Sequence, residues 1–298
     1  MTTEVTRLTV VTGDDASRRR RRRIMSVVAH TLLIATSIIM LYPLLWLLAA
    51  SFRPENEIFT SGISVMPSWN WSIDSYFRGW NGLRVSFGTL FLNSFTISIL
   101  SVIGNVVACS LAAYAFSRLE FYGRRFWFAM MLMTLMLPYQ VTLIPQYVLF
   151  LNMGWINTFL PLVVPKFLAA DAFFIFLMVQ FFRGIPKELD EAARMDGAGP
   201  WRIYWKIILP LSTPVLATAA IFTFIWTWDD FFGPLIYLSD LRQYTVMLGL
   251  RTFTDSTGMS DYGGLFAMSV LSLVPIFLFF LFFQRLLIEG IATTGMKR

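Results

Sequence analysis

Six stretches of the chain are apolar over lengths that suit membrane-spanning helices. An α-helix needs about 20 predominantly apolar residues to cross the hydrocarbon core of a bilayer. The stretches that reach this length are Ile24–Ala50, Phe87–Phe116, Phe126–Phe150, Phe159–Phe182, Thr213–Leu238 and Gly263–Phe283. None shows the alternation of apolar and polar residues that the strands of a membrane barrel need. The pattern predicts an all-α, polytopic membrane protein with six transmembrane helices.

The composition supports this class. Of the 298 residues, 56% are hydrophobic and 14% are charged, with a mean hydropathy of +0.63. A soluble domain has about a quarter of its residues charged, so this chain cannot cover a surface with polar groups. A soluble enzyme and a disordered protein are both excluded. The first apolar stretch is about twice as long as the core of a signal peptide, so we expect it to be retained as a transmembrane helix.

The basic residues orient the chain. The formal net charge is +6, and six arginines stand together at Arg18–Arg23, directly before the first apolar stretch. With the N-terminus inside, 18 of the 24 Lys and Arg residues fall on inner segments and five on outer loops, while Lys166 lies within a span. Basic residues are enriched on the cytoplasmic side of membrane proteins. We therefore expect both termini to be cytoplasmic, and we expect the arginine block to contact membrane lipid rather than nucleic acid.

The expected spans divide the chain into a few segments. We expect a disordered, arginine-rich cytoplasmic tail, a first helix with an external loop, a core of five helices with a cytoplasmic connection inside it, and a cytoplasmic C-terminal tail. The N-terminal tail is residues 1–23, and the first helix with its external loop is residues 24–86. The core of five helices is residues 87–285, with the connection at 183–212, and the C-terminal tail is residues 286–298.

The connection between the fourth and fifth spans has the signals of two short helices joined by a turn. Acidic residues fill its first turns, where the helix dipole favours them, and Gly197 and Pro200 suit the end of one helix and the start of the next. At helical spacing, one face of the first helix carries Leu189, Ala192, Ala193 and Asp196. Adjacent alanines allow another protein to approach the backbone closely. On these grounds alone, a docking element and an ordinary amphipathic connector both remain possible.

The same connection matches a motif of known transporters. Glu191, Ala192, Ala193, Gly197, Ile207, Leu209 and Pro210 reproduce the spacing EAA-x3-G-x9-I-x-LP. In these residues the chain resembles the permeases of ATP-binding cassette (ABC) importers. The resemblance implies the type I importer permease fold and makes the connection a coupling helix, which fits a cleft in a separate ATPase. It implies that Glu191 contacts the ATPase, that the alanines allow insertion and that Gly197 makes the turn.

Other motifs are similar to those of the maltose-type sugar importers, and the similarity extends over about residues 30–298. They include Pro138–Pro145, Gly154–Thr158, Phe173–Pro186 and Trp228–Phe231, and Gly290–Arg298 resembles a tail that reaches toward the ATPases. The chain departs from that group at Asp229, where asparagine is frequent, and at Gly233, where a bulky residue is common. The resemblance implies a second permease subunit, two copies of the ATPase, an extracytoplasmic sugar-binding protein and a sugar substrate, in the cytoplasmic membrane of a prokaryote.

The chain lacks the residues for ATP binding of its own. None of its 18 glycines is followed by lysine, so it has no phosphate-binding loop. Cys109 and His30 are the only residues of their types, and neither suggests a metal site. We expect no cofactor on this chain, with ATP and magnesium bound by the partner ATPase. An enzymatic activity would need a nucleophile or metal beside the acidic residues, and nothing in the sequence supplies one.

The candidate substrate pathway consists of polar and aromatic residues in the third and fifth spans: Gln140, Trp226, Trp228, Asp229 and Asp230. Carboxylates accept hydrogen bonds from sugar hydroxyls, aromatic faces stack on sugar rings, and acids within spans are functional candidates by default. The alternatives are an outer belt of tryptophans with solvated acids, or a stand-alone proton-coupled carrier or channel that uses Asp229 and Asp230. Lys166 and Asp171 in the fourth span are interpreted as a structural pair.

Overall fold

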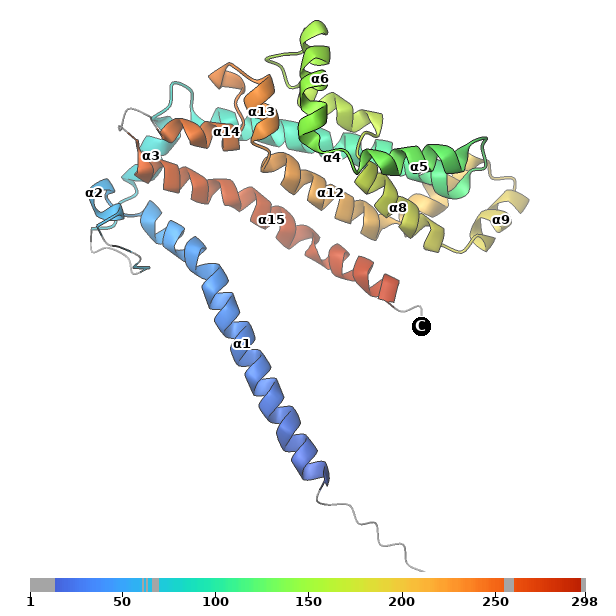
Figure 1. Cartoon of the computed structure of the whole chain (residues 1–298), viewed down its shortest axis with the longest axis horizontal. Helices are drawn as coiled ribbons and strands as arrows, with labels where there is room; N and C mark the ends of the chain where they lie inside the picture. Colours follow the sequence, from blue (N-terminus) through green and yellow to red (C-terminus); the bar gives the residue numbers. More distant parts are fainter. Residues whose placement is uncertain (1–13, 61, 63, 66–69, 255–259, 296–298) are drawn as a thin grey trace, which may run out of the picture.

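The structure, a computed structural model, describes residues 14–60, 62, 64–65, 70–254 and 260–295, with side chains described only between Arg20 and Gln284. Within these residues all regular elements are helical (Figure 1). This confirms the predicted all-α class. The arrangement is one bundle of long helices from which the first helix diverges (Figure 1).

The number of spans also agrees with the pattern of apolar stretches. Four segments are individually long and apolar enough to cross a membrane: α1 (Asp14–Ser51), α4 (Phe87–Arg118), the run from Leu160 to Gly184, and α15 (Tyr262–Gly295). The run contains α7 (Leu160–Val163), the 3-10 helix η1 (Val164–Leu168) and α8 (Ala172–Gly184). Two bent helix pairs complete a maximum of six spans.

The first bent pair corrects the prediction of a single helix over 126–150. α5 (Arg124–Thr134) and α6 (Tyr139–Asn152) meet at 99°. Pro138 stands at the start of α6. Proline has no N–H to donate and disfavours helical geometry in the residue before it, so the helix cannot continue through this position. As a result α6 projects away from the bundle (Figure 1).

Both predicted tails are partly helical. α1 begins at Asp14, so residues 14–23 belong to the first helix and not to a disordered tail, while residues 1–13 lie outside the described residues. Arginine favours helices, and no glycine or proline interrupts this segment. α15 continues to Gly295, well into the predicted C-terminal tail, and residues 296–298 lie outside the described residues.

α4 is the central helix of the bundle. It packs against α8 and α12 (Thr213–Trp228), while α15 packs against α12, α1 and α3 (Asp74–Asn81) (Figure 1). Two buried apolar clusters lie at opposite ends of α4: one includes Ala113, Met178 and Phe182, the other Leu90 and Trp228. The smaller elements are α2 (Glu55–Ile58), α13 (Phe232–Tyr237), η3 (Leu241–Gln243), α14 (Val246–Leu250) and η4 (Arg251–Phe253).

Candidate functional site

The motif-bearing connection folds as two short helical segments joined by a turn, as predicted. The first is α9 (Glu188–Met195), and the second contains α10 (Pro200–Ile203), the short π-helix η2 (Tyr204–Ile208) and α11 (Leu209–Leu211). Gly197 has φ +77° and its N–H bonds to the carbonyl of Arg194, while the N–H of Ala198 bonds to that of Ala193, both at 2.9 Å. This pair of bonds is a Schellman motif, which needs a left-handed residue that glycine supplies without strain.

The face of α9 that points away from the bundle is exposed. Glu191 and Ala192 are exposed and Ala193 is half-buried. Large apolar side chains around them are also exposed: Leu189 (41%), Met195 (88%), Trp201 (65%) and Trp205 (58%). On α9 itself, Leu189 and Met195 are thus accessible together with Glu191 and Ala192. An exposed Ala192 beside Glu191 is what the docking interpretation requires, and that interpretation stays a prediction.

The other motif residues anchor the second segment. Ile203, Tyr204 and Ile208 are buried, Leu209 packs against their cluster, and Ile207 is half-buried. The Tyr204 hydroxyl lies 2.8 Å from that of Ser110 on α4, and the segment bends by 76° into α12 just after Pro210. The second segment is thus held against the bundle mainly by Ile203, Tyr204 and Ile208, with Leu209 as the motif residue that packs against their cluster.

A buried ion pair attaches α9 to the bundle, and the sequence did not reveal it. Nη1 of Arg118, the last residue of α4, lies 3.1 Å from Oδ2 of Asp190, and their side chains are 2% and 7% exposed. In the sequence, Arg118 is one of many inner basic residues and Asp190 one of several acids in a first turn. They are 72 positions apart in the sequence, so no local pattern indicates the pairing.

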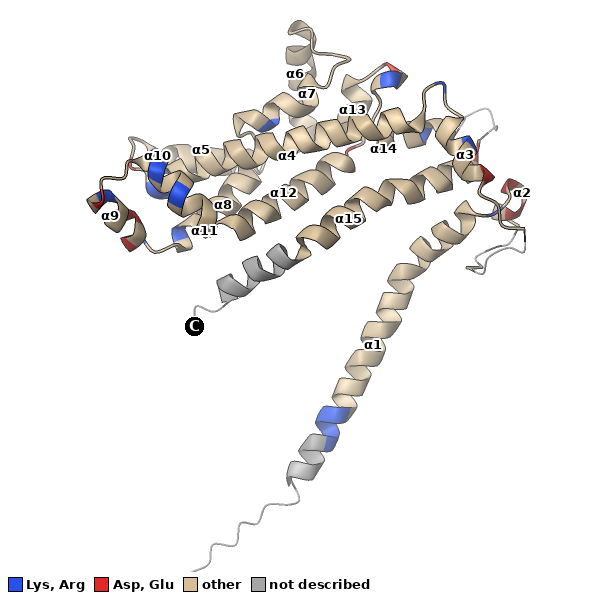
Figure 2. Cartoon of the chain, turned by 180° about the vertical axis from the view of Figure 1, so that it is seen from behind, with Lys and Arg blue, Asp and Glu red and all other residues tan. Residues whose placement is uncertain are grey.

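Charged residues gather at the same end of the bundle. Basic residues of α10 and η2 and mixed charges of α9 stand together, while most of the length of α4, α12 and α15 carries none (Figure 2). A second basic group lies near the start of α1 (Figure 2). Long uncharged segments with charged ends are typical of membrane-spanning helices.

Two of the candidate pathway residues lie at one cavity. Asp230 and Trp226 border a space of about 90 Å³ together with Lys166, Thr223 and Thr227. Oδ1 of Asp230 accepts a hydrogen bond of 3.0 Å from the N–H of Gly233. The other carboxylate oxygen occupies the space that a Cβ at position 233 would take, which accounts for glycine at this position. Ligand pockets are usually larger than about 300 Å³, so this conformation does not enclose a sugar.

Trp228 corrects the sequence prediction. It is fully buried, packs against Phe95 and Phe224, and donates a hydrogen bond of 3.1 Å to the carbonyl of Ser272 on α15. Two residues apart on a helix point to nearly opposite sides, so Trp228 faces the core and Trp226 the cavity. The indole of Trp228 is therefore not available to a substrate in this conformation.

The remaining candidates stand outside the cavity. Gln140 and Asp229 are both exposed, and neither borders the space around Asp230. Lys166, by contrast, borders the cavity and pairs with Asp171 at 2.8 Å across the break before α8, so its structural interpretation stays a prediction.

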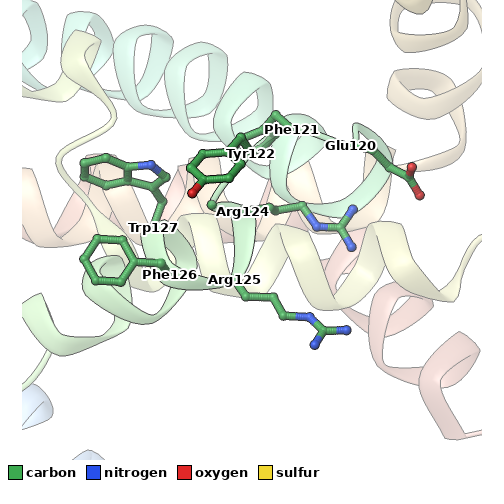
Figure 3. A pocket seen from close by; sticks show the side chains of 8 residues that line it. Glu120, Phe121, Tyr122, Arg124, Arg125, Phe126 and Trp127 are labelled. Carbon is green, nitrogen blue, oxygen red and sulfur yellow. The ribbon is translucent and has the colours of Figure 1, made fainter.

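An open hollow of about 890 Å³ lies at the connection between α4 and α5. Tyr122, Phe126 and Trp127 gather on one side of it, while the side chains of Arg124 and Arg125 extend together on the other (Figure 3). Aromatic and basic side chains together are typical of the membrane–water interface. None of the predicted site residues borders this hollow.

Comparisons with known proteins agree with these features. The family described as "binding-protein-dependent transport system inner membrane component" matches residues 104–292. The chain is 36% identical to the arabinooligosaccharides transport system permease protein AraQ of Halalkalibacterium halodurans, over 87% of this chain and 92% of that protein. It is 34% identical to the diacetylchitobiose uptake system permease protein NgcG of Streptomyces coelicolor, over 91% and 88% of the two chains.

A third relative and a solved structure extend the comparison. The chain is 31% identical to the sn-glycerol-3-phosphate transport system permease protein UgpE of Brucella abortus, over 90% of this chain and 96% of that protein. The fold resembles that of a bacterial ABC transporter involved in the import of the acidic polysaccharide alginate, with a TM-score of 0.78 at 24% identity. That match covers 89% of this chain and 97% of the other.

Proposed function

The chain belongs to the family of binding-protein-dependent transport system inner membrane components, and we propose that the cargo it carries across the cytoplasmic membrane is a sugar or an oligosaccharide. It is the permease subunit of an ABC importer, with a type I permease fold. Relatives named for arabinooligosaccharides and diacetylchitobiose support a carbohydrate. A relative named for sn-glycerol-3-phosphate keeps a phosphorylated cargo among the candidates.

The observation that carries the mechanism is the exposed face of α9. In the proposed complex, Glu191 contacts the ATPase while Ala192 and Ala193 let α9 enter a cleft in it. Two ATPase copies bind ATP and magnesium, and a second permease subunit completes the pathway. A sugar-binding protein delivers the cargo from outside. Closure of the ATPases pushes α9, and the helices alternate between inward-facing and outward-facing states.

Asp230 and Trp226 are the residues through which this chain would contact the sugar. Both border the small cavity beside α12, and an aromatic face next to a carboxylate suits the apolar face and the hydroxyls of a sugar ring. Gln140 and Asp229 are proposed only as outer parts of the pathway, since they are exposed outside the cavity. The family match favours this importer over a stand-alone proton-coupled carrier.

The first test is to purify the tagged chain from its native host in mild detergent and identify its partners. The proposal expects one ATPase and a second six-span permease, in a 2:1:1 ratio with this chain. ATPase activity is then titrated with a panel of sugars and glycerol phosphate, each presented with the binding protein. Recovery of the chain alone across several detergents would contradict the proposed complex.

A further inference from the structure

We propose that Arg118 is a positioning residue that transmits movement of α9 into α4. The inference rests on the proposed function, because it assigns a residue to the coupling between an ATPase and the membrane helices. It concerns a residue outside the Glu-Ala-Ala motif, on the side of α9 where Asp190 is buried against the end of α4.

One guanidinium group joins three elements. Nη1 of Arg118 lies 3.1 Å from Oδ2 of Asp190 in the first turn of α9. Nη2 donates hydrogen bonds of 2.5 and 2.7 Å to the carbonyls of Phe182 and Ile185 at the end of α8. The Phe182 carbonyl lies in the last turn of α8, at the negative end of the helix dipole, which favours a cation. The end of α4, the end of α8 and the start of α9 are therefore fastened at a single side chain.

The arrangement suits transmission of movement. Asp190 directly precedes Glu191 of the docking face, so a displacement of α9 acts on the ion pair within one residue. Because the pair is buried, salt screens the attraction between Arg118 and Asp190 only a little. The guanidinium is a rigid planar fork, so it cannot follow Asp190 without also pulling on the α8 carbonyls or on α4. α4 in turn packs against α12, which borders the cavity of Asp230.

The surroundings leave room for such a movement. A hollow of about 540 Å³ lies beside the ion pair and is bordered by Lys187, Glu191 and Arg194 of the α9 region and by Leu119 after α4. α9 is therefore held to the end of α4 by a specific contact and not by close packing on all sides.

The test uses the complete complex of this chain, its partner permease and the ATPase, reconstituted in lipid nanodiscs. Cys109 is replaced by serine and a reporter is introduced as Thr227→Cys, which borders the cavity of Asp230. Maleimide labelling of the reporter is measured without nucleotide and with ATP plus vanadate. Arg118→Lys keeps the charge but loses the fork, and Asp190→Asn keeps the shape but loses the charge. Arg125→Lys and Glu120→Gln are the matched controls, since both residues are exposed, Arg125 in the first turn of α5 and Glu120 in the connection before it.

In the parent complex the nucleotide should change the labelling rate about tenfold, within the range of coupling between distant sites. The proposal expects Arg118→Lys and Asp190→Asn to reduce this change to less than about twofold, with the ATPase still bound and with both controls at the parental value. The proposal would be overturned if nucleotide changed the labelling rate of Arg118→Lys and Asp190→Asn as much as that of the parent complex. Loss of the ATPase from these variants would also overturn it, because the ion pair would then only hold the docking surface in place.

The two hypotheses fail in different ways. If the parent complex itself retains no ATPase, the proposed function is wrong, whatever the variants do. If the parent responds to nucleotide and the two variants respond equally, only the role of Arg118 is wrong. Should Arg118→Lys fail to accumulate in the membrane, the isosteric Asp190→Asn decides the outcome.

Discussion

The side-chain amide of Asn105 donates a buried hydrogen bond of 2.7 Å to the hydroxyl of Thr223, and this bond joins α4 to α12 in the middle of the bundle. The amide oxygen of Asn105 accepts a further hydrogen bond of 3.0 Å from the thiol of Cys109. Asn105 and Cys109 are fully buried and Thr223 is 1% exposed. Lipid solvates apolar side chains about as well as protein does, so apolar contacts alone give membrane helices little reason to associate. Interhelical hydrogen bonds of this kind therefore help to hold the helices together.

Replacing Thr223 with valine should destabilise the protein by about 1 kcal/mol, because it leaves the Asn105 amide without its acceptor. The measurement is thermal unfolding in detergent, followed by near-UV circular dichroism. Thr218→Val is the matched control, since the hydroxyl of Thr218 bonds only to a carbonyl of its own helix. Equal unfolding temperatures for the two variants would contradict a role for the bond between α4 and α12.

A bulky residue at Ala192 should block the docking of α9. Ala192→Trp adds a large side chain to the exposed face and should abolish ATP-dependent uptake, while leaving the amount of chain in the membrane unchanged. Ala129→Trp makes the same change on an exposed position of α5 and should preserve uptake. The measurement is uptake of labelled sugar by cells. Uptake at the parental rate in Ala192→Trp would rule out this face of α9 as the docking surface.

The turn after α9 should depend on the backbone of Gly197. Gly197→Ala puts an L-residue at φ +77° where there is open space for its Cβ, so its cost is strain of about 1 kcal/mol. Gly199→Ala also adds a Cβ in open space, but its φ of −76° suits any residue. We expect less ATPase to copurify with the first variant and the parental amount with the second. The same yield with both variants would show that this turn does not set the position of α9.

The two tryptophans of α12 should behave differently. Trp228→Ala removes a fully buried indole and should destabilise the protein by about 3 to 5 kcal/mol. Trp226 is 51% exposed at the cavity, so Trp226→Ala should unfold near the parental temperature. If the proposed pathway is correct, Trp226→Ala should raise the sugar concentration needed for half-maximal uptake. Thermal unfolding and uptake kinetics together test the assignment, and a reversed order of stability would refute it.

The sequence predicted the features that are encoded locally. Six apolar stretches predicted the spans, and the acids, Gly197 and Pro200 predicted the two short segments of the connection and its turn. Each of these signals lies within about one helix length. Proline also explains the break at Pro138, although the continuous apolar run from Phe126 to Phe150 concealed the bend.

The sequence did not predict which residues meet across the bundle. α12 is apolar on nearly every side, so no periodicity shows that Trp228 faces the core while Trp226 faces the cavity. Arg118 and Asp190 look like ordinary charged residues near helix ends, and only the packing of α4, α8 and α9 makes them a buried pair. The exposed positions of Gln140 and Asp229 likewise follow from the tertiary arrangement.

In the proposed function, this permease moves its cargo by coupling to a separate ATPase through α9. The most direct test is uptake of radiolabelled sugar into proteoliposomes that contain both permease subunits, with the loaded binding protein added outside and ATP enclosed. We expect uptake only when the ATPase is present and the enclosed nucleotide is hydrolysable. Uptake driven by a pH gradient in proteoliposomes that lack the ATPase would contradict it.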